Sequence, residues 1–277
     1  MPGADSVLVS ALCARLGDCR VVDLGQPYRP GMEQSAAATP FQQHLVRRHG
    51  DVVRPDGGSS ATDLLISGTH VGTHIDAFAH YSHDGRLHGG TDAVTAQAAG
   101  FPDHDVRSIP PIVGRGVLLD VPAALGLAAC PAAYEITPAD LDATVQVQGT
   151  EPRPGDVLLV RSGWPLIAAT SGRGVEGVPG VGEAGAYWLA GQQPRAVGAD
   201  TGGFERLPPS PDVRTALPAH RIFLYEHGIN IMENVQLEEL AAGGHHEFVI
   251  IVAPMPLEGA TGGPVRPLAL LPGGLTG

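Results

Sequence analysis

The residues best suited to chemistry lie in one short segment, GTHVGTHIDAFAH, residues 68–80. His70, His74, Asp76 and His80 are separated by even numbers of residues, so an extended chain directs all four side chains to one face. The glycines and threonines between them disfavour a helix. Imidazole and carboxylate are ligands of Zn²⁺ and Mn²⁺, and two histidines with one aspartate leave coordination positions open, which is typical of catalytic sites. The segment therefore predicts a catalytic metal site on an extended stretch of chain.

The elements around this segment indicate an α/β fold. Short apolar runs that end in Gly, Pro or Asp predict strands with both faces covered; they lie at residues 19–25, 61–68, 114–121, 156–164, 194–200, 220–228 and 245–257. Helices are expected at residues 92–99, 138–145, 183–191 and 236–241. Strands outnumber helices without alternating strictly with them. We therefore expect a single domain with a mixed, partly antiparallel sheet.

Domain organisation follows from the absence of repeats and long linkers. Residues 1–19 predict an N-terminal helical extension, with a short helix over Val7–Leu16, and residues 20–277 form the main domain. The glycine-rich stretch 170–185 predicts a long irregular loop, which in a compact domain favours a lid over the substrate.

Composition excludes several classes of protein. The net charge is −12 with no basic run, so nucleic acid and anionic membranes are poor partners and a small molecule is expected instead. All 17 basic residues are arginine, which rules out lysine Schiff-base chemistry and a P-loop lysine. Three cysteines, the lack of an apolar run of membrane-spanning length and the lack of a basic leader favour the cytoplasm.

The segment from His70 to His80 resembles the H-x-G-T-H-x-D-x-P-x-H signature of the metal-dependent cyclase family, which includes bacterial kynurenine formamidases and isatin hydrolases. Further segments are similar to family motifs: VVDLGQPYRPGM, LLVRSGW, AVGAD, AHRIFLYEHGINIMENVQL and FVIIVAPMPLEGATGGPVRPL. Together they cover about residues 20–270. The resemblance implies a fold of the swivelling β/β/α type and a homodimer.

The resemblance also implies roles for individual residues. His70, His74 and Asp76 bind a metal ion, and Asp76 is placed to bridge to a second one. His220 and Glu233 are the implied ligands of that second ion. The cofactor is then one or two ions of Zn²⁺ or Mn²⁺, and His80 is the general acid/base.

Some positions depart from the family pattern and suggest substrate contacts. Phe78 replaces the proline of the signature and is expected to wall the pocket, while the first turn offers Tyr28 and Met32 where formamidases have a tryptophan. Arg161 and Asp200 lie at the ends of predicted strands and are candidates for positioning the substrate. The run from His220 to Glu233 is one residue longer than the formamidase pattern, which predicts a bulge.

These features predict a hydrolase that opens an amide, lactam or ester bond of a small metabolite, with aromatic metabolites among the candidates. A metal-activated water attacks the carbonyl, and His80 transfers the proton. Two alternatives stay open: a metal-dependent cyclase or dehydratase, and a non-catalytic binder of metal or small molecules. Product mass separates the first two, because hydrolysis adds one water and dehydrative cyclisation removes one.

Overall fold

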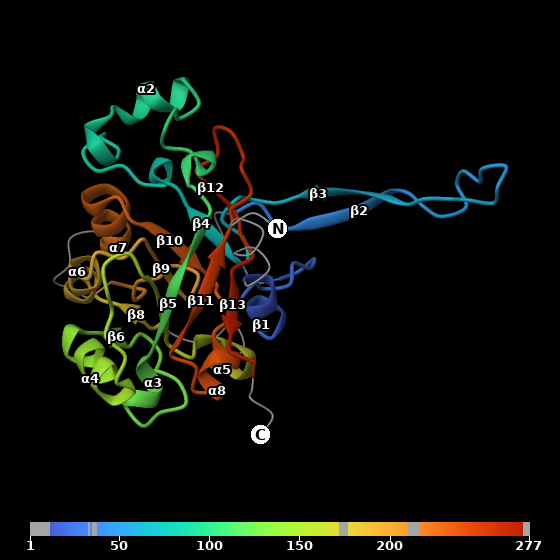
Figure 1. The fold of residues 1–277 in the computed structure, drawn as a ribbon. Coiled ribbons are helices and arrows are strands. Elements are labelled where there is room, and N and C mark those ends of the chain that lie inside the picture. The colour runs from blue at the N-terminus through green and yellow to red at the C-terminus, as the bar shows by residue number, and fades with distance from the viewer. Residues whose placement is uncertain (1–11, 33, 35–37, 172–176, 210–215, 274–277) are drawn as a thin grey trace, which may run out of the picture.

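A nine-stranded mixed sheet forms the centre of the protein, which we describe from a computed structural model (Figure 1). The structure describes residues 12–32, 34, 38–171, 177–209 and 216–273. The strands follow one another in the sheet as β1 (Arg20–Asp23), β13 (Leu268–Leu271), β11 (Glu247–Val252), β5 (Ile112–Asp120), β7 (Val157–Arg161), β9 (Ala196–Ala199), β10 (Asn230–Glu233), β4 (His74–Asp76) and β12 (Gly262–Pro264).

The middle of the sheet is parallel and its two edges are antiparallel. Strands β5, β7, β9 and β10 run parallel to one another, whereas β1, β13 and β11 on one side, and β4 and β12 on the other, pair antiparallel with their neighbours. The expected single α/β domain with a mixed, partly antiparallel sheet is confirmed.

Two apolar cores cover the two faces of this sheet. Successive residues of β7 alternate between them: Val157 and Leu159 enter one core, Leu158 and Val160 the other. This follows from the two-residue period of a strand buried on both faces. The first core also joins Val22, near one edge of the sheet, to Ile75, near the other edge, so the sheet is curled around it.

Helices and turns cover the sheet and supply the loops at its strand ends. The longer helices are α4 (Pro138–Gln148), α5 (Trp164–Ser171) and α6 (Glu183–Gly191); the shorter ones are α2 (Ala93–Ala98), α3 (Val121–Ala124), α7 (Pro218–His220) and α8 (Glu238–Ala242). Single 3₁₀ turns are η1 (Phe78–His80), η2 (His88–Gly90) and η3 (Val106–Ser108), and η5 (Arg221–His227) is a π-helical segment. A capping box between Thr137 and Asp140 begins α4, as the sequence T-P-A-D favours. No helix among the described residues is both long and apolar enough to cross a bilayer.

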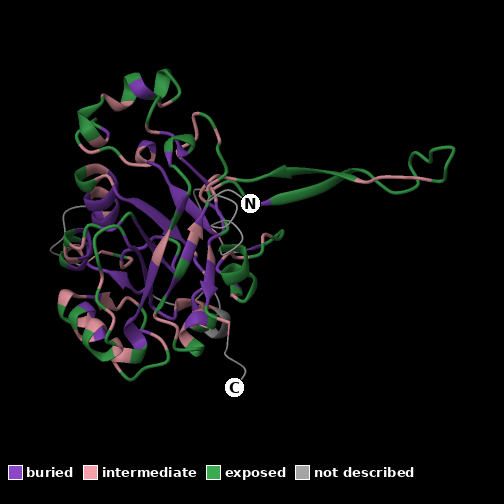
Figure 2. Cartoon of the chain, in the orientation of Figure 1, coloured by how far each residue is buried: buried purple, intermediate pink, exposed green. Residues whose placement is uncertain are grey.

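A two-stranded arm projects far from the body of the molecule (Figure 1). It consists of β2 (Gln42–Arg47) and β3 (Thr62–Ile66), and every residue of both strands is exposed, as the green colour in Figure 2 shows. A second small pair joins β6 (Glu135–Ile136) to β8 (Gly180–Val181) beside the main sheet. The expectation that residues 61–68 form a strand with two covered faces is therefore right for the strand and wrong for its burial.

Several other predictions need correction. Residues 220–228 are helical, in α7 and η5, because an apolar run such as Arg221–Tyr225 suits a buried helix as well as a buried strand. The predicted bulge before Glu233 is wrong, since the pairing of β10 with β4 and β9 is continuous; the chain between His220 and this strand forms the π-helical segment instead. Stretch 170–185 is only partly irregular, since β8 and α6 begin inside it; residues 172–176 lie outside the described residues. Residues 1–11 also lie outside them, and residues 12–17 are helical.

Candidate metal and substrate site

The four residues of the motif do not share one strand, contrary to the expectation of a single extended face. Only His74–Asp76 forms a strand, β4. Gly72, with φ of +62°, turns the chain before this strand, and η1 turns it afterwards. These two turns bring His70 and His80 back towards Asp76, so the residues converge from three consecutive pieces of chain.

Tyr28 and Met32 pack against the turn at Gly72, which precedes β4. The Tyr28 hydroxyl donates to the carbonyl oxygens of Val71 (2.7 Å) and Thr73 (2.9 Å). A Cβ on Gly72 would lie 2.9 Å from the Tyr28 ring and 3.0 Å from the Met32 methyl group, so only glycine fits. Burial raises the pKa of Tyr28 to about 12, which keeps its hydroxyl a donor. Tyr28 and Met32 thus shape the motif.

Two carboxylates occupy the centre of the site. In the pairing of β4 with β10, Glu233 lies opposite His74, so both side chains and that of Asp76 point to the same face. His74 Nε2 lies 3.5 Å from Asp76 Oδ1 and 3.4 Å from Glu233 Oε2. His220 Nε2 lies 3.6 Å from the other oxygen of Asp76 and 3.4 Å from the other oxygen of Glu233. Each carboxylate therefore has one oxygen near His74 and the other oxygen near His220.

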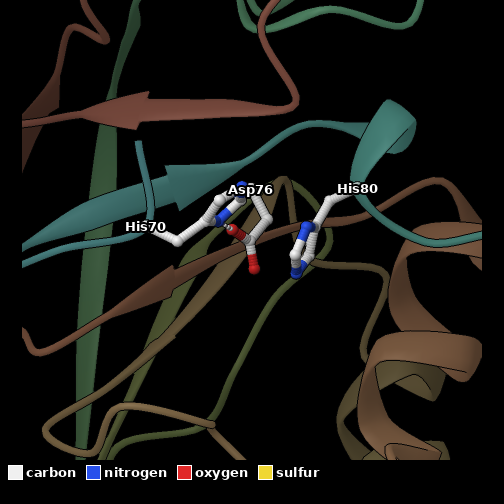
Figure 3. Close-up of side chains that lie close together, drawn as sticks. All are labelled: His70, Asp76 and His80. Atoms are coloured by element: carbon white, nitrogen blue, oxygen red, sulfur yellow. Dashed lines mark hydrogen bonds and ion pairs between the residues drawn. The ribbon is translucent and has the colours of Figure 1, made fainter. Parts of the chain in front are cut away.

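His70 and His80 complete the site on the side of Asp76 (Figure 3). His70 Nδ1 lies 2.6 Å from Asp76 Oδ1, and its Nε2 lies 2.9 Å from the Thr261 hydroxyl. The His80 ring stacks on that of His70 at 4.0 Å between centroids and lies 5.6 Å from the ring of His220. One ligand atom each of His70, Asp76 and His80 falls within 4.8 Å of the others.

The donor set fits divalent metal ions. His74 Nε2, Asp76 Oδ2 and Glu233 Oε1 are buried, and none has a hydrogen-bond partner among the described residues. Leaving such atoms unsatisfied is costly unless something else binds them. Separations of 3.4–3.6 Å are long for hydrogen bonds but are close to the edge of a tetrahedron, about 3.3–3.4 Å, around a zinc ion with bonds of about 2.0–2.1 Å.

The electrostatics of the cluster favour charged carboxylates. Burial alone would raise the pKa of Asp76, but the imidazoles of His80, His70 and His74 hold that pKa below its usual range. Burial lowers the pKa of His80 to about 4 despite the nearby carboxylate of Asp76. Burial also opposes the charged form of His220, yet its carboxylate neighbours hold its pKa well above the usual value. The cluster is thus an anionic centre surrounded by imidazoles.

A cavity of about 350 Å³ opens beside His70. Trp164 and Pro165, at the start of α5, provide an apolar wall, while Gln26, Asn234 and Asp200 provide polar groups. Asp200 accepts hydrogen bonds from the backbone N–H groups of Ser162 and Gly163 and from the Ser162 hydroxyl. Burial raises the pKa of Asp200 to about 6. The side chain thereby fixes the turn that leads into Trp164.

Of the expected substrate contacts, Asp200 alone lines this cavity. Tyr28 and Met32 lie under Gly72, and Phe78 packs against His88, with 5.1 Å between ring centroids. The structure does not bring Arg161 to the site. Its buried guanidinium is bound by Asp120, Glu238 and the Ala128 carbonyl, a network that holds strand ends together.

Sequence reasoning missed Glu205 and the polar group Gln26. The Glu205 carboxylate contacts His220 Nδ1 at 2.8 and 3.1 Å and is fully buried. The sequence TGGFE around it has no recognisable ligand spacing, so only the fold reveals the contact. Gln26 lies within the segment VVDLGQPYRPGM, but nothing in the sequence indicated its position next to the motif, where its backbone N–H donates to the Thr73 hydroxyl (2.7 Å).

Comparisons with known proteins show which family and which relatives this chain resembles. The "Putative cyclase" family model matches residues 22–206. The kynurenine formamidase of Bacillus cereus (strain ATCC 14579) is 25% identical over 250 residues, which cover 88% of this chain and 94% of that enzyme.

Solved structures share the fold. The crystal structure of a novel cyclase superposes with a TM-score of 0.80 at 24% identity, covering 97% of this chain and 91% of the other. Isatin hydrolase A from Ralstonia solanacearum superposes with a TM-score of 0.70 at 24% identity and covers 98% of each chain. Because the family model spans well over half of the sequence, the chain belongs to the "Putative cyclase" family.

Proposed function

We propose that this protein is a metal-dependent hydrolase that cleaves an amide, lactam or ester bond of a small aromatic metabolite. The observation that carries the proposal is the pair of buried carboxylates, Asp76 and Glu233, each shared between two histidines beside a cavity. The related formamidase from B. cereus and the isatin hydrolase from R. solanacearum are hydrolases by name, and they support this class.

In this proposal the metal is Zn²⁺ or Mn²⁺, one ion or two. His70, His74, Asp76 and Glu233 would hold one ion, and His220 together with Asp76 and Glu233 would hold a second. A bound divalent ion supplies an activated water and polarises the scissile carbonyl. Two ions would suit the arrangement in which each carboxylate has one oxygen near His74 and the other near His220.

The remaining steps belong to the chain's own residues. His80 lies beside the cluster, partly exposed, and with a lowered pKa it is neutral at neutral pH and able to accept a proton. It then returns that proton to the leaving nitrogen or oxygen. Trp164 and Pro165 offer an apolar surface for an aromatic ring. Gln26 Oε1 is buried without a hydrogen-bond partner among the described residues, so it is placed to accept from a substrate N–H.

A substrate panel tests this function. N-formyl arylamines, aromatic lactams and lactones are incubated with Zn²⁺- or Mn²⁺-loaded protein, and products are analysed by mass spectrometry. We expect gain of one water, and a fall in kcat of about 10²–10⁴-fold for His80→Gln with unchanged metal content. His83→Gln, in the next turn, is the matched control and keeps activity. Loss of water from a substrate would instead support a cyclase, and loss of bound metal in His80→Gln would make His80 a ligand.

We also propose a homodimer, on the basis of the arm formed by β2 and β3. An isolated two-stranded ribbon is marginally stable in water, yet this one exposes Leu45, Val46, Leu64, Leu65 and Ile66. A second copy of the chain is the partner expected to cover them. Sedimentation should give a dimer that dissociates in Leu64→Ser/Ile66→Ser but not in Val94→Ser, which changes an exposed apolar residue on α2. A monomeric wild type would contradict the dimer.

The remaining parts of the proposal concern location and chain organisation. Cys13, Cys19 and Cys130 are all free thiols, which suits the reducing cytoplasm. Residues 1–19 are proposed as a helical extension of the domain formed by residues 20–277, and residues 170–185 as a cover for the cavity that Val178 lines.

A further inference from the structure

His74 and His220, which each lie close to both Asp76 and Glu233, differ in the group that contacts their second ring nitrogen, Nδ1. His74 Nδ1 lies 2.8 Å from the carbonyl oxygen of Gly72, which is a neutral acceptor. His220 Nδ1 lies between both oxygens of Glu205, at 2.8 and 3.1 Å. In both cases Nδ1 donates outwards and Nε2 is turned towards Asp76 and Glu233. Only on the His220 side does the outer acceptor carry a full negative charge.

The fold holds Glu205 in this position firmly. The backbone of Glu205 forms an isolated β-bridge with Val181 of β8. It also packs so closely on Gly180 that a Cβ there would lie 2.4 Å from the Glu205 backbone. The preceding Phe204 ring packs edge-on against Phe223 of η5, with 5.2 Å between centroids. Phe223 is three residues after His220, so one contact fixes the carboxylate and the imidazole relative to each other.

We infer that Glu205 is a positioning residue for the metal site: it fixes the ring of His220 and makes the position shared by His220, Asp76 and Glu233 the more strongly anionic of the two. This inference rests on the proposed metal-dependent function. A carboxylate behind a metal-binding histidine orients the ring and increases its basicity, and losing such a partner typically weakens metal binding by about 10–100-fold. The two metal positions are consequently unequal, and Glu205 is the cause.

The test compares metal binding in wild type and Glu205→Gln, by titrating the metal-free proteins with Zn²⁺ against a chromophoric chelator. We expect two binding steps in wild type and a loss of about 10–100-fold in affinity for one step only in the variant. Asp105→Asn is the matched control. Asp105 is also buried, but it binds Ser108 and Gly259 and touches no imidazole of the site. Equal affinities in wild type and Glu205→Gln would overturn the inference.

A second readout needs no metal. The Nδ1 proton of His220, shared with a carboxylate, should give a downfield proton resonance that is lost in His220→Gln and shifted upfield in Glu205→Gln. If Glu205→Gln does not fold, Glu205→Asp retains the charge but withdraws the oxygens, and it should show the same selective loss of affinity. An unchanged resonance or unchanged affinity in the folded variant counts against the role of Glu205. A wild type that binds no Zn²⁺ would overturn the proposed function as well, whereas two-ion binding insensitive to Glu205 would overturn this inference alone.

Discussion

Metal-linked stability offers the most direct test of the site, and Asp76→Asn is the informative change. Asp76 is fully buried and presents one oxygen to His70 and His74 and the other to His220. The substitution keeps the size of the side chain but removes the charge shared by both metal positions. Without metal, three buried polar atoms of the cluster have no hydrogen-bond partner among the described residues.

The magnitude follows from binding linkage. A buried polar atom without a hydrogen-bond partner costs about 1–3 kcal/mol, so an ion that binds three such atoms would stabilise the folded state by several kcal/mol. At free ion concentrations of about 100–1,000 times Kd, the unfolding free energy of wild type should rise by about 2.7–4.1 kcal/mol. For a protein of this size that corresponds to an increase in Tm of roughly 5–15 °C. Asp76→Asn should gain less than about 1 kcal/mol at the same ion concentration.

The assay is thermal unfolding of the metal-free protein with and without added Zn²⁺ or Mn²⁺. Asp84→Asn serves as the control, because this carboxylate is 91% exposed and lies outside the cluster. Its metal-induced stabilisation should equal that of wild type. Equal stabilisation of wild type and Asp76→Asn, or none in wild type, would refute the assignment of the buried carboxylates as metal ligands.

Two further predictions concern the framework of the site. Gly72→Ala should lower the unfolding free energy by about 1–3 kcal/mol, because φ is +62° and the new Cβ would meet the side chains of Tyr28 and Met32. Gly85→Ala is the control: φ is +71° there but no atom lies within 4 Å of the new Cβ, so the loss should be about 1 kcal/mol. Denaturant unfolding of both variants measures the two losses, and equal losses would contradict the packing argument. Asp200 should titrate near pH 6 in the folded protein, above its unfolded pKa of about 3.8, so its favourable contribution is complete below pH 4 and is lost as the pH rises through 6. The difference in unfolding free energy between wild type and Asp200→Asn should therefore move by about 2–3 kcal/mol in favour of wild type from pH 7 to pH 4, and a difference that stays constant with pH would disprove it.

The local features of this protein could be predicted from its sequence. The density of histidines between residues 70 and 80 indicated a metal site because ligand chemistry depends on residue type and close spacing. The apolar runs of β5, β7 and β9 predicted strands buried on both faces, and Thr137 with Pro138 marked the beginning of α4. These signals are short-range, so a single sequence contains them.

Tertiary structure decided everything that depends on contacts between distant segments. It placed Glu233 opposite His74 through the pairing of β4 with β10, and it put Glu205 behind His220. Residues 221–227 form a π-helical segment in the folded protein. The sequence could not show this, because an apolar run alone does not distinguish a buried helix from a buried strand. Arg161 forms buried ion pairs with Asp120 and Glu238, away from the cavity. The sequence shows that a buried charged side chain needs a partner, but only the fold determines which residue that partner is.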